Sequence, residues 1–125
     1  MMNPNGFYKG KLLNLNSSSL IYSFAELLAK IWLPWQGKMF YSETKEGDNV
    51  IFGKHKFPFK FYKGKSLDGA KTEVMILDYN LPENPTKVRK VIDELVLTKK
   101  NYYLGKAYIK KGKDYKLVAN FSLEK

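Results

Sequence analysis

The sequence contains no cysteine and only one histidine and one arginine among its 125 residues. Without cysteine the chain can form no disulfide framework, no thiolate nucleophile and no cysteine-based zinc or iron–sulfur site. The one histidine, His55, excludes a multi-histidine metal centre, and it stands between Lys54 and Lys56, as is typical of a solvated loop. We therefore expect no catalytic histidine, no bound metal and no cofactor.

Sequence motifs for common catalytic chemistry are also missing. None of the seven serines lies in a Gly-x-Ser-x-Gly elbow, and Gly64-Lys65-Ser66 has only the ending of a phosphate-binding loop. The neighbours Asp93 and Glu94 would point to opposite faces of a strand, so they could not act together in one site. The sequence favours a protein without catalysis, and an enzyme that uses a single barrel carboxylate stays an alternative.

The N-terminus has no basic segment followed by an apolar stretch, so no secretory signal is recognised. The longest apolar segment, Leu20 to Trp35, is interrupted by Ser23, Glu26 and Lys30 and is too short to cross a bilayer. We expect a cytoplasmic protein without a transmembrane segment.

Positive charge is concentrated in the last third of the chain. Residues 87–125 carry 11 basic and 4 acidic side chains, out of totals of 22 and 12. Such a field attracts nucleic acid or anionic surfaces, and lysines next to Tyr102, Tyr103 and Tyr115 suit single-stranded nucleic acid. However, Arg89 is the only guanidinium, whereas phosphate and base recognition usually depends on arginine. Binding of nucleic acid or of an anionic surface is thus the second hypothesis.

The length fits one domain over residues 1–125, and a hydrophobic fraction of 44% is enough for a packed core. Apolar residues recur every three or four positions between Leu20 and Trp35, after three serines that can cap a helix. Pro34 should end this element. The pattern predicts one N-terminal helix over 18–33.

The rest of the chain alternates short strand patterns with turns. Strands are expected over 6–15, 38–43, 49–54, 57–62, 72–79, 102–110 and 115–123, with turns at 46–49, 66–69, 98–101 and 111–114. Pro58 lacks a backbone donor, which predicts an edge or late-starting strand. Residues 87–97 fit either a helix or a strand that begins with a helical turn, and the second is favoured.

Together these elements predict a mainly β fold: a single antiparallel β-barrel, or strongly bent roll, of about seven or eight strands with one helix. Eight strands enclose an interior that is just wide enough for one small ligand. The chain has eight Phe, nine Tyr and two Trp. Such rings can fill a core or line a pocket.

Several short motifs carry a family resemblance. Trp35-Gln36-Gly37-Lys38-Met39-Phe40 resembles the opening of GXWXG-type domains of unknown function, although the first glycine of that motif is missing. The chain is also similar to uncharacterised bacterial proteins with a lipocalin-like barrel, through the segments 67–69, 77–79, 84–85, 88–89, 93–94, 103–106 and 120–124. This resemblance implies a calycin-type fold and brings no established activity.

The leading hypothesis is a small-molecule-binding protein that holds a lipid-like or aromatic ligand in the barrel cavity, as a monomer or homodimer. Arg89 would anchor an anionic head group, or else form a salt bridge with Asp78, Asp93 or Glu94. The side chains expected to line or gate the cavity are Trp35, Phe40, Phe59, Met75, Leu77, Tyr79 and Tyr103.

Overall fold

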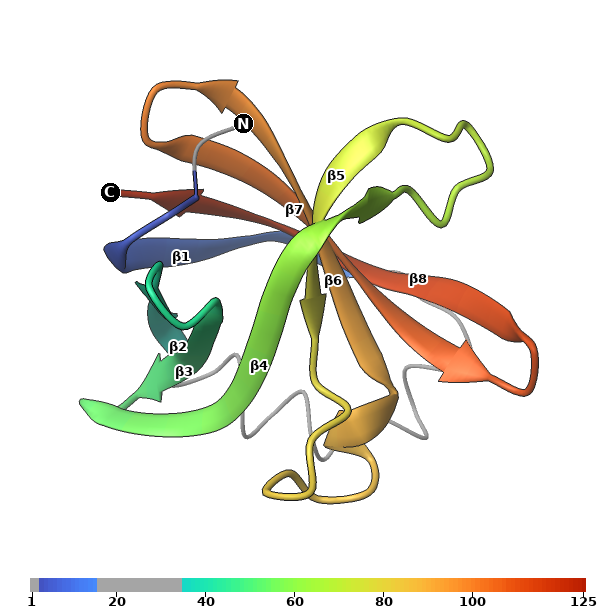
Figure 1. The fold of residues 1–125 in the computed structure, drawn as a ribbon, viewed down its shortest axis with the longest axis horizontal. Coiled ribbons are helices and arrows are strands. Elements are labelled where there is room, and N and C mark those ends of the chain that lie inside the picture. The colour runs from blue at the N-terminus through green and yellow to red at the C-terminus, as the bar shows by residue number, and fades with distance from the viewer. Residues whose placement is uncertain (1–2, 16–34) are drawn as a thin grey trace.

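Every strand of the sheet pairs antiparallel with the next strand along the chain, and the last strand closes on the first (Figure 1). The structure, a computed structural model, describes residues 3–15 and 35–125. Within them the fold is a closed barrel of eight strands, so the prediction of a mainly β antiparallel barrel is confirmed. The helix predicted over 18–33 lies outside the described residues.

The eight strands are six to twelve residues long. Their bounds are β1 Gly6–Leu15, β2 Trp35–Tyr41, β3 Glu46–Ile51, β4 Lys54–Lys65, β5 Glu73–Asp78, β6 Val91–Lys99, β7 Tyr102–Lys111 and β8 Asp114–Glu124. Most predicted strands are found, but the strand predicted over 49–54 is wrong, because β3 ends at Ile51, the chain turns at 52–53 and β4 begins at Lys54. The turn predicted at 46–49 is also wrong. The chain turns at 42–45 instead, where Lys45 adopts a φ of 60°, and Glu46 already pairs with Tyr41.

Residues 87–97 follow the favoured interpretation. A short 3-10 helix, η1, covers Val88–Lys90, and β6 begins at Val91. Val88 is 1% exposed and packs into the core. The sequence pattern of this segment fits both a helix and a strand because a single helical turn places Val88 inward, and the period-two alternation of β6 begins directly after it.

Pro58 lies within β4 rather than at a sheet edge, which corrects the sequence prediction. The pairing of β3 with β4 shifts between Gly47 and Asn49, opposite the segment that contains Phe57 and Pro58. Phe57 there has a φ of 54°. A bulge tolerates a residue without a backbone donor, so the closed barrel accommodates this proline without an exposed edge.

The barrel interior of the described residues is filled mainly by aromatic and aliphatic side chains. Phe40 is central, with ring centroids 5.4 Å from both Phe59 and Phe61 and 5.5 Å from Tyr8. These pairs adopt the edge-to-face geometry that aromatic quadrupoles favour. Met75, Leu77, Leu95 and Leu123 are fully buried in the same core cluster.

Three strand glycines give these rings room. A Cβ at Gly10 would lie 2.3 Å from the Trp35 ring, one at Gly47 would lie 2.5 Å from the Phe59 ring, and one at Gly105 would lie 2.3 Å from the Phe121 ring. Each ring therefore occupies the space that a side chain on the glycine would need. The interior can hold these large aromatic rings because glycine stands at the strand positions that face them.

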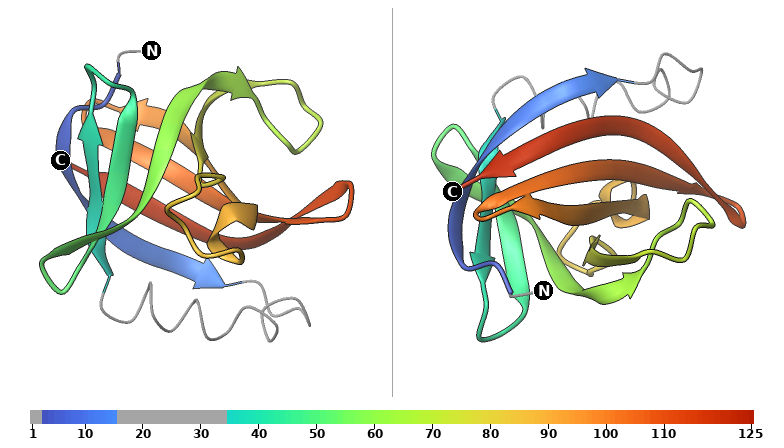
Figure 2. Two further views of the ribbon diagram at one scale, coloured as in Figure 1. Left: turned by 60° about the horizontal axis from the view of Figure 1, so that its bottom comes forward. Right: turned by 90° about the horizontal axis from the view of Figure 1, so that it is seen from above.

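The turns of an up-and-down barrel alternate between its two ends. At one end the termini meet the β2–β3 and β6–β7 turns: Lys125 N donates to Asn101 O, and Ser42 N donates to Asn5 Oδ1. The β3–β4 turn, the β5–β6 connection and the β7–β8 turn belong to the other end, in the lower half of Figure 1. Figure 2 shows the hairpins β4–β5 and β7–β8 extending to one side of the barrel. Among the described residues, no helix is long and apolar enough to span a bilayer.

We expect Gly105→Ala to destabilise the barrel by about 1–3 kcal/mol, because its methyl group would overlap the Phe121 ring. Chemical denaturation of this variant, of Phe121→Ala and of the double variant gives the coupling between the two sites. In the Phe121→Ala background the added methyl group should cost much less. Equal costs in both backgrounds would contradict the packing argument.

Candidate functional site

A charged pair lies inside the barrel, where a lysine and an aspartate are least expected. Lys38 on β2 and Asp93 on β6 are 4% and 3% exposed, and Lys38 Nζ lies 3.1 Å from Asp93 Oδ2. Both are interior because of register: Lys38 shares the inward face with Phe40, and Asp93 shares it with Val91 and Leu95.

Two further polar side chains complete the cluster. Lys38 Nζ donates to Asn49 Oδ1 at 2.7 Å and to Tyr79 OH at 2.5 Å, which with Asp93 satisfies all three of its protons. Tyr79 OH donates to Asp93 Oδ2, and Asn49 Nδ2 donates to Tyr79 OH and Phe57 O. The cluster is thus a complete hydrogen-bond network that joins β2, β3 and β6 with the end of β5.

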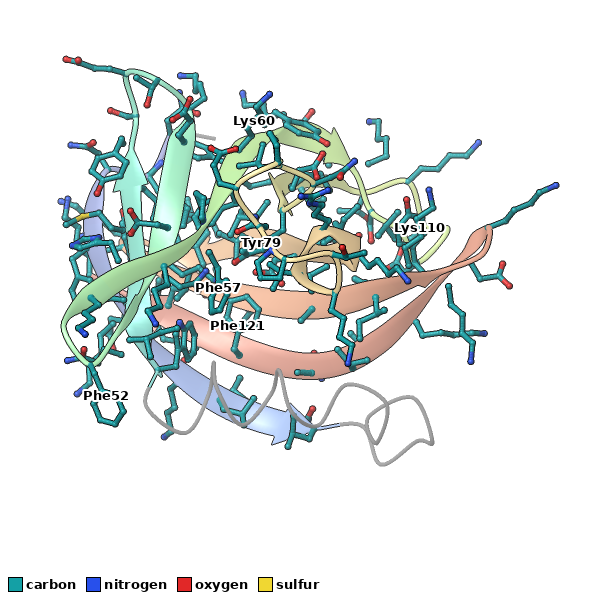
Figure 3. All side chains as sticks on the ribbon, turned by 90° about the horizontal axis from the view of Figure 1, so that it is seen from below. Phe52, Phe57, Lys60, Tyr79, Lys110 and Phe121 are labelled. Atoms are coloured by element: carbon teal, nitrogen blue, oxygen red, sulfur yellow. The ribbon has the colours of Figure 1, made fainter. Side chains whose placement is uncertain are left out.

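Aromatic rings enclose this ammonium group. Four ring centroids lie 5.2 to 5.5 Å from Lys38 Nζ, those of Trp35, Phe59, Tyr79 and Phe121. The Trp35 indole N–H also donates to Asn49 Oδ1 at 3.1 Å. Figure 3 shows Tyr79, Phe57 and Phe121 together in the middle of the barrel. Faces of aromatic rings attract cations, so the apolar wall itself helps to hold the charge.

Burial governs the protonation of the cluster. Desolvation lowers the pKa of the Lys38 ammonium, and the negative charge of Asp93 opposes that shift. Desolvation, followed by the Asp93 carboxylate, holds the pKa of the Tyr79 hydroxyl well above its ordinary value. Tyr79 therefore stays neutral and remains a donor to Asp93.

The structure gathers most of the residues that the sequence proposed as a ligand lining into the packed core. Trp35, Lys38 and Tyr79 meet at the polar cluster. The fully or almost fully buried members of the proposed lining are Phe40, Phe59, Met75, Leu77, Tyr79 and Tyr103. The two cavities described below are lined by none of the eight proposed residues.

Arg89 does not form the proposed salt bridge with Asp78, Asp93 or Glu94. Its Nε donates to Asn84 O at 2.8 Å and its NH2 group donates to Pro82 O at 2.9 Å. Arg89 therefore stabilises the connection between β5 and β6 by donating hydrogen bonds to two of its backbone carbonyls. Prolines in this connection supply no backbone N–H of their own.

A cavity of about 560 Å³ is lined mostly by residues on the face of the sheet opposite the core, together with Gly105 and Phe121 of the interior row. Across β6, β7 and β8, Glu94 pairs with Lys106 and Lys106 pairs with Asn120, one position away from the interior row that contains Asp93 and Ala107. We call this cavity the outer groove. Its lining consists of Leu13, Asn14, Ser66, Asp68, Thr72, Val74, Glu94, Val96, Leu104, Gly105, Lys106, Asn120 and Phe121.

The connection between β4 and β5 folds over part of this face and buries Glu94 to 3% exposure. Ser66 Oγ donates to Glu94 Oε1 at 2.8 Å, and the Leu67 backbone N–H donates to Glu94 Oε2. Lys106 is opposite Glu94 in register, but its ammonium lies 4.0 Å from Asp68 Oδ2 instead. Within the described residues, Glu94 is a buried carboxylate with hydrogen bonds and no ion pair.

A second, smaller cavity of about 250 Å³ is more polar and lies over β1, β7 and β8. It is lined by Lys9, Gly10, Lys11, Tyr102, Ser122 and Glu124. Elsewhere on the surface, His55 Nδ1 lies 2.7 Å from Asp48 Oδ1 at an exposed position, in keeping with the interpretation of His55 as a solvated residue.

The sequence analysis did not predict that Lys38, Asn49 and Asp93 form one buried polar cluster. A signal was present for two of them, because Lys38 and Asp93 each occupy an inward position in a strand of otherwise apolar alternation. The expectation that Asp93 and Glu94 point to opposite faces is confirmed by their partners, Leu77 for Asp93 and Ile76 for Glu94. Nothing in the sequence spacing brings Asn49 to the same place.

Comparisons with known proteins give no family: no family model, no curated protein and no solved structure matches this chain.

We expect Lys38→Met to destabilise the barrel by about 3–5 kcal/mol, because it leaves the Asp93 carboxylate buried without its cation. Adding Asp93→Asn should recover a large part of that loss, since an amide carries no charge to desolvate. Urea unfolding of the two single variants and the double variant measures this. A double variant as unstable as the sum of the singles would show that the ion pair is not the relevant interaction.

Burial raises the pKa of Tyr103 to about 12, with a smaller contribution from Tyr8. Between pH 10 and about 12 the unfolded chain loses the Tyr103 proton and the folded chain keeps it. The free energy of unfolding therefore falls as pH rises through this window. Tyr103→Phe should show a smaller alkaline loss of stability than the native protein in chemical denaturation.

Proposed function

We propose that this protein binds a small amphipathic molecule, with an apolar body and a cationic or hydrogen-bond-donating group, and that the molecule occupies the outer groove. The observation that carries this proposal is the buried Glu94 carboxylate, 3% exposed and without an ion pair in the described residues, in the lining of a cavity of about 560 Å³. Small-molecule sites of this size combine apolar walls with a few polar groups.

The walls of the outer groove suit such a ligand. Val74 is buried, and Val96 and Leu104 are 42% and 43% exposed, so a bound molecule would cover apolar surface that now faces solvent. Glu94 provides a carboxylate at a buried position, where a charge-assisted hydrogen bond to a cationic ligand is stronger than in water. The pKa of Asp68, at the rim, is lowered mainly by the Ala70 backbone N–H, which keeps a second negative charge nearby.

The ligand-binding hypothesis from the sequence placed the molecule inside the barrel. The packed rings around Phe40 and the complete hydrogen-bond network of Lys38 favour the outer groove over that position. A lipocalin-like relationship stays part of the proposal, supported by the closed eight-strand antiparallel barrel. The enzyme hypothesis has a barrel carboxylate in Asp93, but that carboxylate is already paired with Lys38 and Tyr79.

Two probes with the same apolar body test the proposal, 4-phenylbutylamine and 4-phenylbutyrate. We expect the amine to raise the thermal midpoint and the carboxylate to have little effect, because only the amine complements Glu94. Glu94→Gln should weaken amine binding about tenfold. Leu104→Arg, which introduces a long cationic side chain at the groove, should weaken it as well.

The control variant is Met75→Leu, a conservative change in the fully buried core. It should leave amine binding unchanged if the outer groove is the site. Loss of binding in Met75→Leu but not in Glu94→Gln would instead indicate an interior site. Failure of both probes to bind the native protein would overturn the proposal.

A further inference from the structure

The turn between β3 and β4 carries the most exposed large apolar side chain among the described residues. Phe52 is 80% exposed, and Figure 3 shows it projecting from one extremity of the barrel. Ile51 pairs with Lys54, so Phe52 and Gly53 are the two central residues of a tight hairpin turn. The Gly53 backbone N–H donates to Gln36 Oε1, which ties this turn to β2.

The backbone of Phe52 is strained for a residue of its kind. Phe52 has a φ of 52° and Gly53 a φ of 72°, the left-handed pair that a type I′ turn requires. That turn favours Asn-Gly or Gly-Gly, and a bulky residue with positive φ is an outlier. Burial of the ring could offset the cost of this backbone conformation, but the Phe52 ring is almost entirely exposed. We infer that Phe52 does not stabilise the fold. Strain of this kind is a reason to look for function.

The positive charge of the protein gathers around the same end of the barrel. Residues 52–56, 79–90 and 110–116, which we call the basic end, contain nine basic and two acidic side chains. The connections at the opposite end, 41–46, 65–73 and 98–102 together with 124–125, contain six basic and five acidic side chains. The basic end occupies the lower half of Figure 1, and Figure 3 shows Phe52 and Lys110 toward its two extremities. The basic residues from the last third of the sequence therefore form only part of the basic end, which also contains basic residues from 52–56.

We propose that the basic end docks this protein onto the surface of an anionic lipid bilayer, with the Phe52 ring inserted among the lipid head groups. Lysines near an anionic surface each contribute to attraction that salt screens. An exposed aromatic ring at the apex of a hairpin adds an apolar anchor that salt does not screen.

The chemistry of this end favours a bilayer over a nucleic acid. Single-stranded nucleic acid stacks its bases on rings that line a groove, whereas Phe52 stands at the apex of a turn. Eight of the nine basic side chains are lysines, and Arg89, the remaining one, is hydrogen-bonded to Pro82 and Asn84. Lysine supplies a point charge and lacks the planar fork that recognises phosphate bidentately.

The central test is Phe52→Asn, which should move two measurements in opposite directions. Asparagine before glycine suits the type I′ turn, so the free energy of unfolding should rise in urea denaturation. Cosedimentation with vesicles of phosphatidylcholine and phosphatidylserine should weaken about tenfold, because the apolar anchor is lost. Vesicles of phosphatidylcholine alone should bind the native protein weakly.

Two further variants separate the anchor from the charge. Lys54→Glu combined with Lys56→Glu leaves seven basic and four acidic side chains at the basic end, so it should weaken vesicle binding at low salt and reduce its salt dependence. Phe7→Ala removes a ring that is 40% exposed at the opposite end of the barrel, and it should leave vesicle binding unchanged.

The proposal is overturned if the native protein does not bind anionic vesicles at low salt, or if Phe52→Asn binds them as well as the native protein does. A single-stranded oligonucleotide retained by the native protein, with no vesicle binding, would assign the basic end to nucleic acid instead. A fall in stability of Phe52→Asn would show that Phe52 serves the fold.

Discussion

The interior of this barrel depends on one charged contact, between Lys38 on β2 and Asp93 on β6. Two buried charges are tolerated in a low-dielectric core only when each is paired and hydrogen-bonded. Here Asn49 and Tyr79 satisfy what the ion pair leaves open, and four rings surround the ammonium group. Strands that are not neighbours in the sheet are thereby held in one register, because a slip by one residue would carry either charge to the outside.

The same alternation that buries this pair creates the outer groove. Asp93 points inward to Lys38, so its neighbour Glu94 points outward, beneath the β4–β5 connection. One dipeptide thus supplies a carboxylate to each face of the sheet. The inner carboxylate has a cation, whereas among residues 3–15 and 35–125 the outer one has only Ser66 and Leu67 as partners. This difference is why the proposed ligand site lies outside the core.

The fold was predictable because its signals are local. Alternation marked the strands, and the helix–strand ambiguity at 87–97 proved to be η1 followed by β6. The site was less accessible, because Lys38, Asn49, Tyr79 and Asp93 meet only after the barrel closes. Residues in contact within this cluster are separated by 11 to 55 positions in the chain. Period-two alternation predicts the face of the sheet on which a residue lies, but it does not predict which strand lies across the barrel from it. The turn misplaced at 46–49 has a similar cause, since Gly47 leaves room for the Met39 backbone oxygen and the Phe59 ring and does not bend the chain.

Two of the glycine–ring pairs also constrain how this barrel can diverge. Where Gly10 faces Trp35 and Gly105 faces Phe121, neither member can change size alone without overlap or a void. Gly47 differs, because a Cβ there would also lie 2.4 Å from the Met39 backbone oxygen, whatever the size of residue 59. Distant homologues should therefore exchange the two members of the first two pairs together, a ring shrinking where its glycine gains a side chain. Covariation at these two pairs would persist after overall identity has faded, and it offers a signature by which kinship to this chain can be traced.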